Sequence, residues 1–458
     1  MTVDGQSAGS APARPSTWRP GPWLAWGFYD IGQRAFGALI LTYIFAPYFA
    51  SALWPDPARG QAAWGLTIAC AGLLIAIMAP LLGAIADASG PKKPWIAFFG
   101  AMLVAGSASL WWAQPGHPSA VMVAIVGVIV AAVGSEMSVV FHNALLPTLA
   151  RREQIGRLSG LGWALGTAGA MMALLVVLGA LAVDPRSGLT LGGWAPMFAL
   201  DPVETTAGRL VGPLVAVWFA IFVTPMFLWM PDEKRSEAPL FRSIRNGLTG
   251  LRITLAELRS DRKLSTFLIA YLLYSDGLIT LVAFGGVYAA GLLGWGAIQL
   301  AALGLTLGLF AGPFVLLTGR LDDRIGPQRV VTLCLLALSV ATVGLLGVSK
   351  TGLFGMTFPG LSGGHFLLFF AIIIGLCGGP LQSSSRTLLA HLAPRERITQ
   401  MFGLLALSGR VTSFAGPALV GVITAWTGSQ RLGFSVALVF LVAGAVFILR
   451  LARMEERS

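Results

Sequence analysis

Ionisable residues are rare inside the apolar segments of this chain, and they mark the places where chemistry could occur. Asp30 and Arg34 lie four residues apart in the first segment, so a helix would present them on one face. Asp276 lies at a similar depth in the seventh segment. A buried carboxylate can bind an amine or a proton, and a guanidinium offers a planar fork of donors to a carboxylate or phosphate. These three residues are therefore candidates for substrate binding or proton coupling.

Structural roles stay open for the same residues. Arg34 alone could neutralise Asp30, and the backbone or a hydroxyl such as that of Thr280 could satisfy Asp276. We favour a functional role more strongly for Asp276, because the sequence places no cation close to it.

Further ionisable side chains lie in other apolar segments. Glu136, in the fourth segment, could relay protons or pack against a cation. Arg410, in the eleventh, could bind an anion or neutralise Glu136. His142 lies near the inner end of the fourth segment, where we expect it to face the surface, and Arg386 lies at the inner end of the tenth. The tyrosines that precede the two aspartates complete the candidate site: Tyr29 and Tyr274.

Signatures of enzymes and resident cofactors are missing from the sequence. It has no Gly-Lys-Ser phosphate-binding loop, no zinc-ligand spacing and no nucleophile elbow. The three cysteines lie in apolar runs without metal-ligand spacing, as expected for small core residues: Cys70, Cys334 and Cys377. We expect neither an enzyme nor a cofactor, and we expect transport driven by gradients.

The composition indicates an all-α integral membrane protein. Of the 458 residues, 56% are hydrophobic and 11% are charged, and the mean hydropathy is +0.77. Soluble domains carry about 25% charged residues. The net charge of +11 does not indicate nucleic-acid binding, because the cations concentrate in loops on one side of the membrane.

Twelve apolar segments, at about 20 residues each, are long enough to cross a bilayer as helices. Their approximate limits are 23–52, 62–85, 94–113, 120–144, 158–183, 210–230, 264–293, 297–318, 330–348, 365–389, 401–426 and 432–451. If the N-terminus is cytoplasmic, most loop cations fall inside. The outer loops then hold only Arg59, Arg186, Arg209, Lys350 and Arg431. We therefore predict that both termini are cytoplasmic.

A repeated loop follows the second and the eighth segments. Residues 83–93 read GAIADASGPKK, and residues 319–329 read GRLDDRIGPQR. The first glycine permits close helix packing, the Gly-Pro pair ends a helix, and the cations favour the cytoplasm. The paired positions are Gly83 with Gly319, Asp87 with Asp323, Gly90 with Gly326, and Lys93 with Arg329; Lys92 adds a further cation.

A second repeat relates residues 143–153 to residues 386–396, again after even-numbered segments. Both repeats predict two six-helix halves. The helical spacing of leucines in the linker between the halves predicts an amphipathic helix on the inner membrane surface. The predicted divisions are a disordered cytoplasmic tail at 1–21, an N-terminal bundle at 22–230, the linker at 231–263, a C-terminal bundle at 264–451 and a tail at 452–458.

The repeated loop resembles the one that follows helices two and eight in the major facilitator superfamily of transporters. Residues 141–147 with 156–166, together with 26–30, 274–277 and 378–386, resemble a narrower group, the unknown-major-facilitator family that includes the yeast autophagy-related vacuolar amino-acid effluxer. The chain departs from that family at residues 30–36, where Arg34 is added, and at His142, where a tyrosine is usual.

The resemblance implies alternating access around a midplane site, with the export of an amino acid or a similar small polar solute. In this architecture the first and seventh helices line the central cavity, so we expect Asp30 and Asp276 to face each other across it. Asp87 and Asp323, with Lys92, Lys93 and Arg329, would hold the inner gate closed.

Alternative functions are an exporter of lipophilic drugs or lipids and a non-transporting receptor or scaffold. The expected partners are a small-molecule substrate, protons and the lipid bilayer, with no nucleic acid. We expect a monomer in a bacterial inner membrane.

Overall fold

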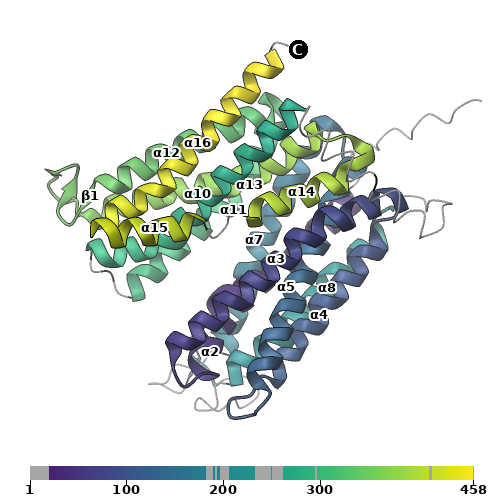
Figure 1. Ribbon diagram of the computed structural model, residues 1–458, viewed down its shortest axis with the longest axis horizontal. Helices are drawn as coiled ribbons and strands as arrows, with labels where there is room; N and C mark the ends of the chain where they lie inside the picture. Colours follow the sequence, from purple (N-terminus) through teal and green to yellow (C-terminus); the bar gives the residue numbers. More distant parts are fainter. Residues whose placement is uncertain are drawn as a thin grey trace, which may run out of the picture.

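The computed structural model describes residues 20–181, 189–190, 193–195, 206–232, 249, 261–293, 295, 297–411 and 415–456. Helices make up almost all of it (Figure 1). In the N-terminal half they are α1 (Pro20–Phe36), the π-helical turn η1 (Gly37–Tyr43), α2 (Phe45–Ala52), α3 (Pro57–Ser89), α4 (Lys93–Ser109), η2 (Leu110–Trp112), α5 (Ala120–Ala144), α6 (Leu146–Leu149), η3 (Arg152–Gln154), α7 (Ile155–Ala180) and α8 (Thr206–Trp229). In the C-terminal half they are α10 (Arg262–Leu293), α11 (Ala297–Ile325), α12 (Pro327–Gly347), α13 (Gly363–Leu392), η4 (Arg395–Arg397), α14 (Ile398–Val411), α15 (Ala415–Thr427) and α16 (Gln430–Glu456).

Ten helical spans among the described residues are long and apolar enough to cross a membrane. They correspond to ten of the twelve predicted segments. The eighth predicted segment falls on α11, and the eleventh falls on α14 and α15, which residues 412–414 separate. The first predicted segment differs from a single regular helix, because η1 and the following Ile44 divide it into α1 and α2.

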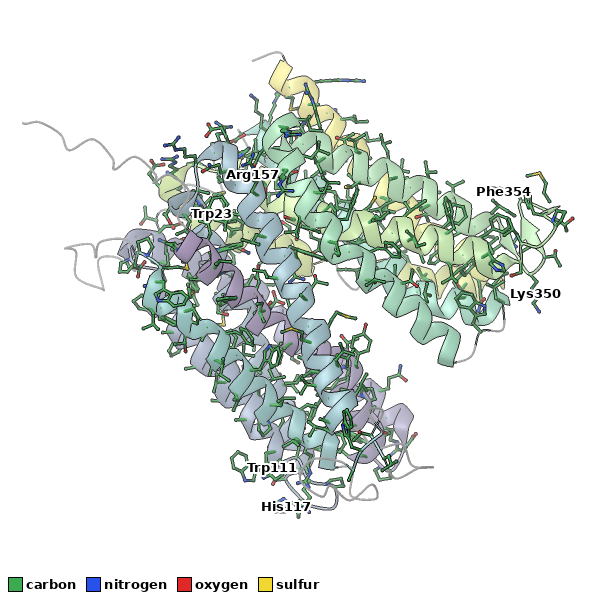
Figure 2. The ribbon with its side chains drawn as sticks, turned by 180° about the vertical axis from the view of Figure 1, so that it is seen from behind. Trp23, Trp111, His117, Arg157, Lys350 and Phe354 are labelled. Atoms are coloured by element: carbon green, nitrogen blue, oxygen red, sulfur yellow. The ribbon has the colours of Figure 1, made fainter. Side chains whose placement is uncertain are left out.

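The two halves meet at one end of the molecule and diverge towards the other (Figures 1 and 2). We call the end that carries the repeated loops 83–93 and 319–329 the motif end, and Trp23 and Arg157 mark it in Figure 2. We call the other the hairpin end. There the tip of the N-terminal half, near His117, lies far from the tip of the C-terminal half, near Lys350.

Both repeated loops adopt the predicted turn after a helix. Gly90 follows α3 with a φ of 93°, and Gly326 follows α11 with a φ of 89°. These angles lie in the left-handed region, which glycine reaches without the steric penalty of a Cβ atom. The next helix starts within three residues, so each loop is a tight connection between two consecutive helices.

A small antiparallel sheet between α12 and α13 is absent from the sequence-based prediction. It consists of β1 (Val348–Ser349), β2 (Gly352–Leu353) and β3 (Met356–Thr357), with β2 in the middle. Two-residue strands leave too short an alternation to detect in a sequence. The predicted amphipathic helix of the linker lies almost entirely outside the described residues.

Candidate functional site

A charged cavity of about 240 Å³ lies between the two halves. Both halves supply its polar lining, from α1, α5 and α7 on one side and α10 and α13 on the other. The polar and aromatic lining residues are Asp30, Gln33, Arg34, Glu136, Asn143, Trp163, Tyr271, Gln382, Arg386 and Phe402. Two carboxylates and two guanidinium groups therefore share one small space, as in sites that bind solutes carrying both signs of charge.

Arg386, which lines this cavity, links the two halves. Its Nη1 lies 3.7 Å from Asp30 Oδ2 and donates a hydrogen bond of 3.3 Å to Asn143 Oδ1. Its Nη2 donates a bond of 2.9 Å to the Ser159 carbonyl oxygen. All three partners belong to the N-terminal half, whereas Arg386 lies on α13. The ion pair of Asp30 is thus made across the interface and not with Arg34, its neighbour on α1.

Arg34 lies one turn after Asp30 on the same face of α1 and also lines the cavity. Its guanidinium carbon lies 4.6 Å from the centroid of the Trp163 ring, a cation–π distance. Its Nε is buried and has no hydrogen-bond partner among the described residues. A buried N–H donor without an acceptor lowers the stability of the fold. A bound solute could supply the missing acceptor.

A second cavity, of about 380 Å³, shares Gln33, Arg34 and Glu136 with the first. It continues along α1 and η1 as far as Tyr43 and along α7 as far as Leu174. Because α1 starts at the motif end, these later residues lie towards the hairpin end. Arg34 and Glu136 therefore stand where a solute entering from the hairpin end would reach the central cavity.

The candidate tyrosines hold helices together and do not line the central cavity. The Tyr29 hydroxyl is 2.5 Å from Ser138 Oγ, joining α1 to α5, and the Tyr274 hydroxyl is 2.6 Å from Ser385 Oγ, joining α10 to α13. His142 is completely buried, so its predicted surface position is wrong. Its ring stacks between Tyr29 and Trp26, at centroid distances of 3.8 and 4.5 Å.

Asp276 does not face Asp30 across the cavity, contrary to the expectation. It is completely buried, and it is not among the residues that line the central cavity. The turn of α10 that carries Asp276 and Gly277 packs on Gly416 of α15 and Leu441 of α16, inside the C-terminal half. Arg410 lies on α14, but its side chain is outside the described part of the structure.

At the motif end, Asp87 of α3 reaches across to the first turn of α14. Its two carboxylate oxygens accept hydrogen bonds from the backbone N–H groups of Thr399, at 3.2 Å, and Gln400, at 2.8 Å. A carboxylate at a helix N-terminus satisfies unpaired N–H groups and interacts favourably with the helix dipole. Lys92, also buried, lies 3.1 Å from Asp87. We call this contact the α3–α14 latch.

Asp323 of α11 makes the equivalent contact with the first turn of α7. Its Oδ1 accepts a hydrogen bond of 3.0 Å from Gly156 N, and its Oδ2 lies 2.9 Å from Arg157 Nε. We call this the α7–α11 latch. Each half thus places its loop aspartate on a helix of the other half. The cation that pairs with Asp323 is Arg157. Arg329, which we expected to help hold the inner gate closed, is exposed and has no ion pair within the described residues.

Lys93 holds its loop to the end of α8. It donates hydrogen bonds to the carbonyl oxygens of Phe227 and Met230. The Asp232 carboxylate in turn accepts from the backbone N–H groups of Lys92, at 2.9 Å, and Lys93, at 3.1 Å. The loop that carries the α3–α14 latch is therefore fixed within its own half.

Close backbone contact at both latches depends on glycine. A Cβ atom on Gly83 would lie 2.8 Å from the Thr399 carbonyl oxygen, and one on Gly319 would lie 2.7 Å from the Gly156 carbonyl oxygen. Both distances are below the closest approach that real Cβ atoms show, so the halves would have to separate.

We therefore expect Gly83→Ala to prevent full closure of the motif end and to reduce transport about tenfold, a loss of about 1.4 kcal/mol. Gly72→Ala is the matched control on α3, because a Cβ atom there meets nothing within 4 Å. Transport assays of both variants in vesicles test this; equal rates for the two would contradict it.

Sequence reasoning did not place Arg386, Trp163, Asn143 or Ser159 in the site. Only Arg386 gave a signal, as a charge at the end of an apolar segment. The other three carry no charge, and nothing in the sequence relates them to residues more than a hundred positions away.

Comparisons with known proteins agree with this architecture. The model of the family described as "Vacuole effluxer Atg22 like" matches residues 63–457. An uncharacterised MFS-type transporter, YxiO of Bacillus subtilis, is 24% identical over 430 residues, which are 93% of each chain. Autophagy-related protein 22 of Cryptococcus neoformans is 28% identical over 255 residues, which cover 53% of this chain and 45% of that protein.

Solved structures show the same fold. The crystal structure of a bacterial homologue of the iron transporter ferroportin in an outward-facing state superposes with a TM-score of 0.67 and 12% identity, covering 94% of this chain and 98% of the other. At this identity the likeness establishes the major facilitator fold.

Proposed function

Since this chain belongs to the vacuole effluxer Atg22-like family of membrane transporters, we propose that it exports a small polar solute, an amino acid, by alternating access. The observation that carries the proposal is the central cavity, where Asp30, Arg34, Glu136 and Arg386 converge between the two halves. An amino acid carries one carboxylate and one ammonium group, and this lining offers a partner to each.

Arg34 and Glu136 are the two residues that would bind the charged groups of the solute. Arg34 has a buried donor without a partner in the described structure, and both residues line the two cavities. Arg34 would bind the carboxylate and Glu136 the ammonium group. Asp30 and Arg386 instead form an interdomain ion pair, and they would separate when the halves move.

The two latches indicate which conformational state of the transport cycle the structure represents. With Asp87 and Asp323 on the helix N-termini of the opposite half, the motif end is closed. The predicted excess of cations on the motif-end loops favours the cytoplasmic side for this end. The structure would then be the outward-facing state of a bacterial inner-membrane carrier, which acts as a monomer with both termini in the cytoplasm.

Counterflow in proteoliposomes tests the function. Vesicles loaded with a mixed pool of unlabelled amino acids should accumulate external labelled amino acid, and an imposed pH gradient should change the rate if protons are coupled. Uptake that ignores the gradient would indicate an exchanger or a uniporter. Absence of uptake for every amino acid would overturn the proposed substrate.

A further inference from the structure

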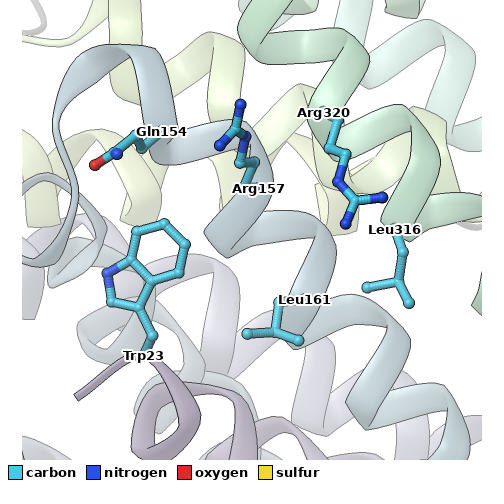
Figure 3. A pocket seen from close by; sticks show the side chains of 6 residues that line it. All are labelled: Trp23, Gln154, Arg157, Leu161, Leu316 and Arg320. Carbon is cyan, nitrogen blue, oxygen red and sulfur yellow. The ribbon is translucent and has the colours of Figure 1, made fainter. Parts of the chain in front are cut away.

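A crevice of about 500 Å³ opens between the halves at the motif end, apart from the central cavity (Figure 3). Its walls come from both halves, so any molecule held in it would contact both. Its lining residues are Trp23 of α1, Gln154 of η3, Arg157 and Leu161 of α7, and Leu316 and Arg320 of α11.

The lining of the crevice has two levels, with charged side chains nearer the motif end and apolar side chains one helical turn deeper. Leu161 follows Arg157 by one helical turn on α7, which runs away from the motif end. Leu316 precedes Arg320 by one turn on α11, which runs towards the motif end. Both arginines therefore lie at the level nearer the motif end and both leucines one turn deeper, as Figure 3 shows. This is the order of polarity that a phospholipid presents, from its headgroup to its acyl chains.

The charged groups of the crevice retain binding capacity. Arg157 engages Asp323 through Nε, and its side chain is 49% exposed. Arg320 is exposed and has no hydrogen bond or ion pair within the described residues. The Gln154 Oε1 atom is buried without a hydrogen-bond partner among them. The crevice thus offers two cationic donors to an anionic ligand.

The opposite face of the molecule provides an internal comparison. The α3–α14 contact repeats the α7–α11 contact: Gly83 meets Gln400 as Gly319 meets Arg157, and Gly403 meets Ala79 as Gly160 meets Val315. This register places three further residues at the positions of Arg320, Arg157 and Leu161, in that order: Ala84, Gln400 and Leu404.

All three of these residues are buried and uncharged, with exposures of 4%, 1% and 4%. Packing of the two halves therefore needs no arginines at these positions, and the charged, open crevice is specific to the α7–α11 side.

We propose that this crevice binds one anionic phospholipid of the leaflet at the motif end. The phosphate would lie between Arg157 and Arg320. One acyl chain would run over Leu161 and Leu316, and the buried Trp23 ring forms the wall of the crevice on α1. Since the phosphate joins a cation of each half, the lipid stabilises the state in which the motif end is closed.

Lipid retention measured on the purified chain tests this without knowledge of the transported solute. Native mass spectrometry should show one bound phosphatidylglycerol at concentrations where phosphatidylcholine does not bind. Arg320→Ala, which copies Ala84 of the opposite face, should weaken phosphatidylglycerol binding about fivefold, the effect of one surface cation. Arg395→Ala removes an exposed arginine of the C-terminal half outside the crevice, and should leave binding unchanged.

Three outcomes would overturn the assignment. If phosphatidylcholine bound as tightly as phosphatidylglycerol, the negative charge of the lipid would not determine binding. If Arg395→Ala weakened binding as much as Arg320→Ala, the lipid would not bind specifically in the crevice. Displacement of the lipid by glycerol phosphate at an equal concentration would show a site for a soluble anion. Thermal unfolding of each variant verifies that Arg320→Ala, a change of an exposed side chain, leaves the fold intact.

Discussion

Replacement of Arg34 by glutamine is expected to lower amino-acid counterflow about 100-fold. Removing one partner of a desolvated charged pair costs about 2–5 kcal/mol, which corresponds to factors of about 30 to several thousand. Arg34 is the guanidinium that lines both cavities, whereas Arg386 lines only the central one. The solute carboxylate would therefore lose its first cationic partner on the path from the hairpin end.

Two further variants separate recognition from folding. Arg34→Lys keeps the charge but loses the planar fork and much of the stacking on Trp163, so we expect an intermediate loss. The double variant Arg34→Gln with Glu136→Gln removes both charges together and should unfold at the wild-type temperature. Wild-type counterflow in a folded Arg34→Gln variant would show that the solute does not contact this residue.

The two latches should respond differently to neutralisation, although they are equivalent by position. Asp323→Asn removes an ion pair between the halves, and its partner Arg157 is half-exposed, so solvent can satisfy the remaining cation. We expect the motif end to open more often and the thermal stability to stay close to wild type. Counterflow should fall because the closed state of the motif end is less populated.

Asp87→Asn should instead destabilise the fold. Its partner Lys92 belongs to the same half and is only 2% exposed, so the variant would leave a buried ammonium group without its partner carboxylate. Breaking a buried pair from one side costs about 3–5 kcal/mol. Thermal unfolding of both variants in detergent measures the difference. Equal midpoints would contradict this account of the α3–α14 latch.

Much of the fold was predictable from the sequence. Apolar segments of sufficient length have few alternatives to membrane-spanning helices, because a bilayer leaves backbone groups no other partners. The repeated loops at 83–93 and 319–329 added the two-half arrangement, and the left-handed Gly90 and Gly326 confirm the turns predicted there. The short sheet at 348–357 was missed because its strands are shorter than any detectable pattern.

The site was predictable only in part, for a physical reason. Charges inside apolar segments identified Asp30, Arg34 and Glu136, which do line the cavity. Whether such a residue faces the cavity or the interior of its own half depends on how distant segments pack together. The sequence alone does not specify that packing. Asp276 therefore faces the interior of its own half, and Asp323 pairs with Arg157 of the other half.

The most direct test of the account measures both ends of the molecule at once. Spin labels at His117 and Lys350 report the separation of the two tips at the hairpin end, and labels at Arg151 and Arg395 report the motif end; all four positions are exposed. The native cysteines are replaced beforehand. In the Asp323→Asn variant, whose thermal stability is expected to stay close to wild type, alternating access predicts a longer motif-end distance together with a shorter hairpin-end distance. Distances that stay fixed at both ends, or that lengthen together, would contradict it.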